Sequence, residues 1–206
     1  MWYATKWFSV TGLLCGFVLM GNTYGDESAS VQVGDAAPEF QCVDDRGQNW
    51  NSKDIVGEKM LVVFFYSSDF SFCCTRQAVR YRDRMRDFRN LGVEVVGISG
   101  DAVEAHRLFR SIHKLNFPLL ADGDGDVARK FGVPLRAGGK AMIADESGQS
   151  IVDDEGRAVK VSRAVTAARW TFVISPEGRV IYRDTEVSPV KDCQEVLEFV
   201  RKLRAQ

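Results

Sequence analysis

Residues 60–77 read MLVVFFYSSDFSFCCTRQ, and the rest of the chain is organised around them. Seven apolar or aromatic residues, Met60 to Tyr66, predict a fully buried strand. A polar turn follows and brings two adjacent cysteines, Cys73 and Cys74, to the start of a long helical pattern. We therefore expect a strand-to-helix junction with a thiol in the first helical turn.

A cysteine at the N-terminus of a helix lies where its charged form is favoured. The unpaired backbone N–H groups and the positive end of the helix dipole both stabilise a negative charge there. The thiolate is the nucleophilic form of cysteine, so the position itself suggests reactivity. The junction is therefore the candidate site for chemistry.

Outside this stretch, buried strands alternate with amphipathic helices. The helix that starts at the cysteines has an apolar face over 78–91 and ends at Gly92. The other predicted elements are a hairpin turning at Asp45–Gly47, a strand at 93–100, a helix at 102–115, a strand at 117–122, an aspartate-capped helix within 122–133, two paired strands at 169–175 and 180–184, and a last helix with Ser188 as its cap and Pro189 in its first position.

The segment from Pro134 to Ala167 does not fit this alternation. It contains alternating polar and apolar residues after a DDEG turn, which is typical of an added hairpin. A partly mobile excursion from the fold is the alternative. The sequence assigns no role to this segment.

The order of elements indicates an α/β fold with one core. Strands that alternate with helices imply crossover connections and a mostly parallel central sheet covered on both faces. The late hairpin and the terminal helix complete the layers and make the sheet mixed. This order, with a cysteine at the first strand-to-helix junction, is typical of a thioredoxin-like fold.

Composition narrows the classes of partner. The 206 residues are 45% hydrophobic, and 27 basic against 28 acidic side chains leave a net charge of -1. Such a balance provides no excess of basic residues for binding nucleic acid and little attraction to a membrane surface. We expect a small neutral substrate or a protein partner instead.

The N-terminus is typical of a secretory signal peptide. Lys6 precedes an apolar run from Trp7 to Met20, and a polar stretch follows. We predict a signal peptide at 1–25, a single domain at 26–206, and an exported protein in the periplasm or outside the cell, with no stable membrane insertion after cleavage. The run is short for a membrane-spanning helix, although an N-terminal membrane anchor is the alternative.

Four cysteines remain after removal of Cys15 with the signal peptide. Their spacing contains no C-x-x-C pair and no Cys/His grouping typical of zinc, so we predict neither a metal site nor a cofactor. His106 and His113 lie seven positions apart on one helical face, and we expect both to be ordinary solvent-side residues.

With Phe65 and Tyr66 at the strand end and DFSFCCTRQA at 69–78, the sequence resembles the peroxiredoxins, thiol peroxidases of the AhpC/TSA type built on the thioredoxin fold. The aromatic strand end at Phe65 and Tyr66 matches the family pattern, and the run DFSFCCTRQA places a hydroxyl residue three positions before Cys74. The residues after Cys74 are similar to the bacterioferritin-comigratory, or Q-type, branch. Other matching stretches are VGDAAPEF near residue 33, FGV after Lys130 and the arginine before TFVIS.

The resemblance implies a role for each of four residues. Cys74 would be the peroxidatic cysteine, which attacks peroxide as a thiolate and becomes a sulfenic acid. Arg169 and the hydroxyl of Ser71 would hold the peroxide oxygens and stabilise the developing charge. Gln77 would orient Arg169.

Three positions depart from the family pattern. Ser67 stands where the motif has a proline, and Ser71 stands where it has a threonine. The branch that matches best often has a resolving cysteine five residues after the peroxidatic one, and that place holds Val79.

The sulfenic acid must be reduced again, and the residues leave the route open. An external thiol, from a thioredoxin-like protein or a small molecule, would make this a one-cysteine enzyme, whereas Cys193 and Cys42 are the candidate internal resolving thiols. By default Cys193 is expected in the core of the last helix, Cys42 as an apolar filler of the first hairpin, and Cys73 as a structural residue.

Two other functions remain in view. An exported thiol–disulfide oxidoreductase would need a second cysteine at position 77, which holds glutamine. A catalytically weakened binding or scaffold module would explain the lost proline and the added segment. The function expected is reduction of hydrogen peroxide or organic hydroperoxides, with a homodimer as a candidate assembly.

Overall fold

The computed structural model describes residues 30–145 and 147–205. The expected signal peptide at 1–25 lies outside the described residues. The strands are β1 (Gln41–Asp44), β2 (Asn49–Asn51), β3 (Met60–Phe65), β4 (Val93–Ser99), β5 (Leu119–Ala121), β6 (Leu135–Met142), β7 (Lys160–Ala167), β8 (Thr171–Ile174) and β9 (Val180–Asp184). The helices are the short η2 (Ser52–Asp54), then α1 (Phe72–Asn90), α2 (Val103–Ile112), α3 (Asp126–Phe131) and α4 (Asp192–Arg204).

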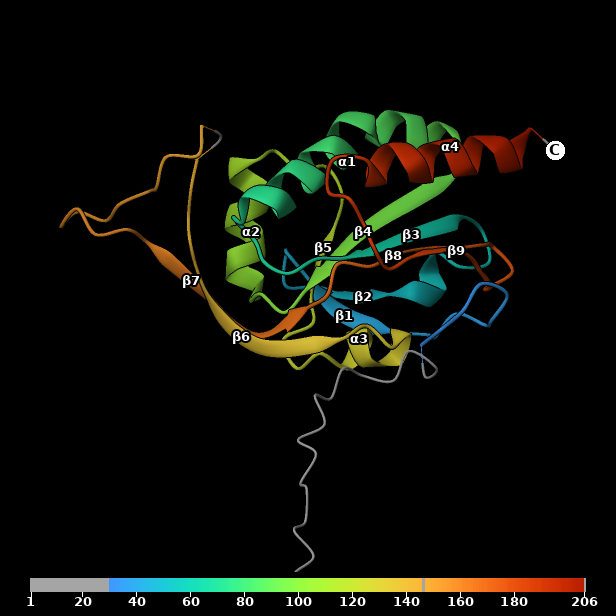
Figure 1. The fold of residues 1–206 in the computed structure, drawn as a ribbon, viewed down its shortest axis with the longest axis horizontal. Helices are drawn as coiled ribbons and strands as arrows, with labels where there is room; N and C mark the ends of the chain where they lie inside the picture. The colour runs from blue at the N-terminus through green and yellow to red at the C-terminus, as the bar shows by residue number, and fades with distance from the viewer. Residues whose placement is uncertain (1–29, 146, 206) are drawn as a thin grey trace, which may run out of the picture.

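The strand β3 lies inside a sheet of order β2-β1-β5-β4-β3-β8-β9 (Figure 1). It pairs in parallel with β4, which pairs in parallel with β5, while the remaining neighbours pair antiparallel. The predicted mixed sheet and thioredoxin-like fold are confirmed. The parallel part is limited to three strands, because both the first hairpin and the pair β8–β9 add antiparallel strands.

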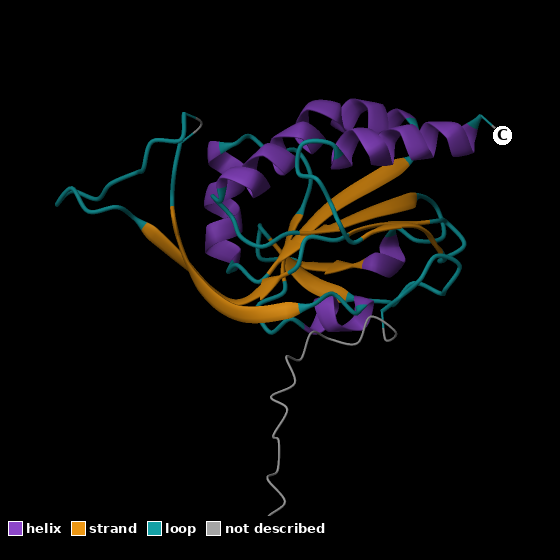
Figure 2. Cartoon of the chain, viewed as in Figure 1, coloured by secondary structure: helices purple, strands orange, loops and turns teal. Residues whose placement is uncertain are grey.

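The residues of β3 divide the core into two layers. All six are buried, as the unbroken apolar run predicts, and they alternate between the two faces of the sheet. On one face Phe64 stacks on Tyr81 of α1, with ring centroids 4.7 Å apart. On the other face Phe65 contacts Phe131 of α3 at 5.5 Å. The helices therefore cover both faces, with α1 and α4 side by side on one of them (Figure 2).

The helix α1 begins and ends where its sequence predicts. Ser71 is the N-cap, and its side-chain oxygen accepts a hydrogen bond from the backbone N–H of Cys74 at 3.4 Å. The face that carries Ala78, Tyr81, Met85 and Phe88 is buried. The chain then turns at Gly92, whose φ of 69° suits a glycine.

Two capping predictions need correction. The helix α4 begins at Asp192, and the Ser188 carbonyl, not its hydroxyl, accepts the backbone N–H groups of Lys191 and Asp192. Pro189 therefore precedes the helix. At α3 the N-cap is Gly125, and the predicted aspartate acts from outside, because Asp122 accepts two backbone N–H groups of the first turn at 2.9 Å.

The two histidines contradict their prediction as solvent-side residues. His106 is 0% exposed and His113 is 3% exposed. Phe109 lies on the same stripe of α2, so the face that carries the histidines is the one that packs on the core. The spacing was interpreted correctly as one face, but the face was assigned to the wrong side.

The segment after Pro134 forms the predicted added hairpin. Strands β6 and β7 make a separate two-stranded antiparallel sheet that curves beside the main sheet (Figure 1). Ile143, just after β6, is buried in the hydrophobic cluster beneath α1. The backbone of Arg163 in β7 forms an isolated antiparallel β-bridge with the backbone of Asp101, just after β4. The hairpin is thus packed against the domain near the carboxyl ends of the central strands.

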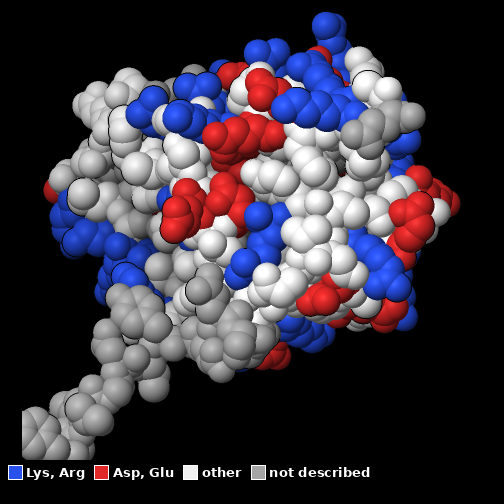
Figure 3. All heavy atoms as spheres, turned by 45° about the vertical axis from the view of Figure 1, so that its right-hand side comes forward, with Lys and Arg blue, Asp and Glu red and all other residues white. Residues whose placement is uncertain are grey.

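Charged residues of both signs are interspersed over the surface in Figure 3. That face carries no continuous field of one sign over the described atoms. Among residues 30–145 and 147–205, no helix combines the length and the apolar character needed to span a bilayer.

Gly100 provides a test of how the hairpin packs on the sheet. A Cβ at this buried glycine would lie 2.3 Å from the backbone carbonyl oxygen of Val165 in β7. We expect Gly100→Ala to lower the free energy of unfolding by about 1–3 kcal/mol, because two backbone segments must separate. Urea denaturation measures the change, and Gly123→Ala, where a Cβ meets nothing within 4 Å, is the control. Equal losses in both variants would contradict the packing described.

Candidate active site

The turn between β3 and α1 places Cys74 inside the protein. The cysteine is 1% exposed, whereas the adjacent Cys73 points outward. Phe70, at the centre of the turn, has a φ of 59°, which is unusual for a residue other than glycine. Its ring is held against Phe109 of α2, with centroids 5.1 Å apart. Core packing therefore sustains a strained backbone directly before the helix that carries the thiol.

Two side chains contact the sulfur of Cys74. The Arg169 Nη2 atom donates to Sγ at 3.3 Å, and the Ser67 Oγ atom lies 3.3 Å from the same sulfur. Burial raises the pKa of Cys74, but the Arg169 charge and the hydrogen bonds from Ser67, from Arg169 and from the nearby Ser71 hydroxyl outweigh it, so the net pKa is lowered. A charge this close contributes on the order of 5 kcal/mol at an effective dielectric of about 20, before desolvation costs.

Arg169 is itself held from behind. Its Nη1 atom donates to the Gln77 side-chain oxygen, and Gln77 Nε2 donates to Asp192 Oδ2 at 2.7 Å. Tyr81 donates to the same carboxylate oxygen at 2.8 Å. Burial raises the pKa of Asp192 to about 6, against the lowering effect of these hydrogen bonds. A polar chain therefore runs from the sulfur through α1 to the start of α4.

A second polar cluster supports the other side of the turn. Asp69 accepts a hydrogen bond from Tyr66 Oη at 2.8 Å, and its second oxygen lies 2.8 Å from Nδ1 of His106. All three side chains are almost fully buried. Burial lowers the pKa of His106, but the charge and hydrogen bond of Asp69 outweigh it and raise the pKa above its usual value.

The structure brings together the four residues predicted for the site. Ser71, Cys74 and Gln77 come from the start of α1, and Arg169 reaches them from the segment between β7 and β8. A thiol surrounded by one fixed cation and hydroxyl groups can attack an electrophilic oxygen and stabilise the charge on the oxygen that leaves. Among the described residues, no grouping of His, Cys, Asp and Glu could hold a metal ion.

The profile of the AhpC/TSA family matches residues 33–183, which include every residue that contacts the sulfur. The chain belongs to this family. It is a peroxiredoxin, a thiol-dependent peroxidase with the thioredoxin fold.

Individual relatives point to one branch of the peroxiredoxins. Peroxiredoxin Bcp of Bacillus subtilis is 33% identical over 138 residues, which cover 66% of this chain and 87% of that protein. The chloroplastic peroxiredoxin Q of Gentiana triflora is 30% identical over 174 residues, covering 84% of this chain and 68% of the relative. The structure of peroxidoxin BcpB from Mycobacterium tuberculosis superposes with a TM-score of 0.67 at 26% identity, over 84% of this chain and 99% of that one.

The candidate resolving cysteines of this peroxiredoxin lie away from Cys74. The Cys193 thiol donates to the Arg80 carbonyl at 3.4 Å. Arg80 lies six residues after Cys74 on α1, a separation of about 9 Å along the helix axis. Cys42 is on β1, separated from β3 by β5 and β4, or about 14 Å across the sheet. A disulfide needs Cα atoms within about 7 Å of each other.

Neither candidate is poised as a thiolate. Burial raises the pKa of Cys193 to about 12, and the charge of Asp192 adds to the effect. Burial likewise raises the pKa of Cys42 to about 12. The Cys42 thiol donates instead to the Ala121 carbonyl at 3.1 Å. The expectation that both are packed residues agrees with their burial and these contacts.

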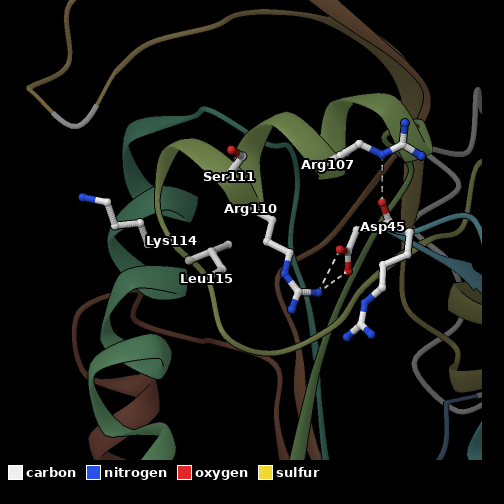
Figure 4. A pocket seen from close by; sticks show the side chains of 7 residues that line it. Asp45, Arg107, Arg110, Ser111, Lys114 and Leu115 are labelled. Atoms are coloured by element: carbon white, nitrogen blue, oxygen red, sulfur yellow. Dashed lines mark hydrogen bonds and ion pairs between the residues drawn. The ribbon is translucent and has the colours of Figure 1, made fainter.

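A basic pocket beside α2 shares no residue with the Cys74 site. Figure 4 shows Arg110 and Arg107 turned toward Asp45, whose carboxylate accepts both hydrogen bonds from Arg110 Nη1, at 2.9 and 2.8 Å. The Asp45 carbonyl accepts from Arg107 Nε at 3.4 Å. These arginines therefore hold the first hairpin against α2.

Three residues of the site were not predicted as parts of it. Asp192, His106 and the Ser67 contact with sulfur all depend on how distant segments meet. For His106 a signal existed in the sequence, because it lies three positions before Phe109 and so belongs to the apolar stripe of α2. For Asp192 the helix pattern gave none, since an acidic residue in a first turn is ordinary.

Asp192 makes stability depend on pH in a defined direction. Its pKa is about 6 in the folded protein against a usual 3.8, so the folded state holds more protons between these values. Stability from this group therefore falls as pH rises from about 4 to about 6, by up to about 3 kcal/mol. Asp192→Asn should remove this fall in urea denaturation curves, whereas Asp54→Asn at an exposed carboxyl should keep it. Parallel curves for the native protein and Asp192→Asn would show that the carboxyl does not titrate in this range.

Proposed function

We propose that Cys74 is the peroxidatic cysteine and that it reduces hydrogen peroxide or an organic hydroperoxide. The observation that supports this most directly is the Arg169 guanidinium at 3.3 Å from its buried sulfur. An isolated thiol with the same burial would be kept protonated, and the Arg169 charge together with the hydrogen bonds to the sulfur reverses the direction of the pKa shift. Ser71 and Arg169 are the proposed peroxide ligands, and Gln77 positions Arg169.

The reaction balances with the groups present. The thiolate of Cys74 attacks one oxygen of the peroxide, so an S–O bond forms as the O–O bond breaks. Sulfur is oxidised to the sulfenic acid, and the second oxygen leaves as alkoxide or hydroxide, which takes up from solvent the proton that the thiol released on ionisation and becomes alcohol or water. Arg169 stays beside the oxygen atoms during the exchange and stabilises the charge as it moves from sulfur to the leaving oxygen.

An external thiol is the proposed reductant, so this would be a one-cysteine peroxiredoxin. It would condense with the sulfenic acid to give a mixed disulfide and water, and a second thiol would then release Cys74 and leave as the oxidised reductant. The positions of Cys193 and Cys42 support this route, because neither lies within disulfide distance of Cys74 without a rearrangement of the backbone. A thioredoxin-like protein or a small thiol fits the role.

The two competing functions receive less support. The position that a dithiol oxidoreductase would fill with cysteine is Gln77, whose amide is fully engaged between Arg169 and Asp192. A scaffold module would have no use for a cation held against a buried thiol. We also propose export through the signal peptide at 1–25, on the strength of the apolar run after Lys6. The homodimer stays a prediction that size-exclusion chromatography tests.

Peroxide consumption by residues 26–206 with excess dithiothreitol tests the assignment of Cys74. We expect Cys74→Ser to reduce the rate to that of buffer with reductant, because the nucleophile is gone. Cys193→Ala and Cys42→Ala should consume peroxide at rates within about threefold of the native protein, since each removes a thiol that takes no part in the cycle.

Mass spectrometry of the oxidised protein separates the two reductive routes. Without reductant, a one-cysteine enzyme should gain oxygen at Cys74, whereas an internal route should lose two hydrogen atoms as a disulfide forms. Circular dichroism confirms that Cys74→Ser is folded. Equal peroxide consumption by the native protein and folded Cys74→Ser would overturn the assignment.

A further inference from the structure

Ser67 is the departure from the peroxiredoxin pattern that lies closest to the reacting atom. The family motif has a proline at this position, which offers no side-chain donor. Here the Ser67 hydroxyl oxygen is 3.3 Å from the Cys74 sulfur. A thiolate can only accept hydrogen bonds, so in the reactive state the proton of this contact must come from the serine.

The protons of the two serines near the sulfur are not equally available. Ser71 donates its hydroxyl to the Ser68 carbonyl at 3.3 Å and accepts the Cys74 backbone N–H at 3.4 Å. One hydroxyl has one proton, so Ser71 can donate to the thiolate and lower the pKa of Cys74 only by giving up that carbonyl. For Ser67, by contrast, the Cys74 sulfur is the hydrogen-bond partner found within the described residues.

Hydrogen bonds hold the chain on both sides of Ser67. Tyr66, directly before it, donates its backbone N–H to Ile98 of β4 at 3.0 Å and its side-chain hydroxyl to Asp69 at 2.8 Å. Directly after it, Ser68 donates to the Asp69 carbonyl at 2.7 Å and accepts from Arg163 of the added hairpin at 3.2 Å. The position of Ser67 in the turn is therefore fixed, and only rotation about its side-chain bonds remains to be ordered when the hydroxyl meets the charged sulfur.

From these contacts we propose that Ser67 is a catalytic residue of this peroxiredoxin, the hydroxyl that donates to the Cys74 thiolate, while Ser71 caps α1 and faces the peroxide. The inference rests on the proposed role of Cys74. The serine thus replaces the steric shield of a proline by a hydrogen bond to the nucleophile.

This role has two opposite effects on reactivity. A hydrogen bond to the thiolate stabilises it relative to the thiol and lowers the pKa, as does the charge of Arg169. The same bond lowers the nucleophilicity of the thiolate, since nucleophilicity falls with pKa with a slope of about 0.4–0.5. Loss of the hydroxyl should therefore slow the reaction at low pH and speed it at high pH.

The test follows alkylation of Cys74 by iodoacetamide against pH, in a Cys73→Ser background that removes the exposed neighbouring thiol. Ser67→Ala should raise the apparent pKa of Cys74 by about one unit, the shift expected for loss of a hydrogen bond to a charged group. Above the new pKa, the variant should react up to about threefold faster than its parent. A crossing of the two pH profiles is an effect that a merely structural role would not produce.

Four further variants keep the result interpretable. Ser67→Thr retains the hydroxyl and should restore the parent pKa, whereas Ser67→Pro should shift the pKa as alanine does. Ser71→Ala should move the pKa less than Ser67→Ala and lower thermal stability more, because it removes the helix cap. Ser111→Ala, at an exposed serine of α2, should change neither quantity.

The outcomes separate this inference from the proposed function. An unchanged pKa in folded Ser67→Ala, or a larger shift in Ser71→Ala, would overturn the role of Ser67 even if Cys74 proves essential for peroxide consumption. If Ser67→Ala shows the expected pKa shift but the native protein consumes no peroxide, the hydrogen bond from Ser67 to Cys74 is supported and the peroxidase assignment of Cys74 is refuted.

Discussion

The site depends on the balance between burial, which disfavours a charged Cys74 sulfur, and the nearby positive charge of Arg169, which favours it. Cys74 is withdrawn from water, and the Arg169 guanidinium beside it makes a charged sulfur tolerable there. The surrounding structure accordingly holds the arginine as well as the cysteine. Gln77 holds Arg169, and the Asp192 carboxylate on α4 holds Gln77. A helix that never touches the sulfur thus contributes to the position of the charge that activates it.

The turn that carries the thiol is braced by a second buried network, independent of the first. Asp69 joins Tyr66 of the strand end to His106 of α2, with every named polar side chain paired. Buried polar groups of this kind rigidify a structure when they are satisfied and are costly when they are not. The strained backbone at Phe70 lies between the two networks, so neither end of the turn is free to relax.

The sequence was informative where the signal was local and silent where it was not. The run of β3 and the start of α1 at the cysteines are encoded by adjacent residues, and the sequence pattern predicted both. The buried position of His106 was missed because an amphipathic stripe gives spacing without saying which side faces the core. The roles of Asp192 and Ser67 were missed for a different reason, since a first-turn acid and a turn serine acquire meaning through partners brought by the tertiary fold.

The length of chain between the partners has a consequence for biosynthesis. Cys74 and Arg169 are separated by 95 positions, and Gln77 and Asp192 by 115. During translation the cysteine therefore emerges long before its cation, as an ordinary thiol with a pKa near that of the free amino acid. Activation of the nucleophile is coupled to completion of the fold, so a nascent or unfolded chain is less exposed to premature oxidation than the finished protein.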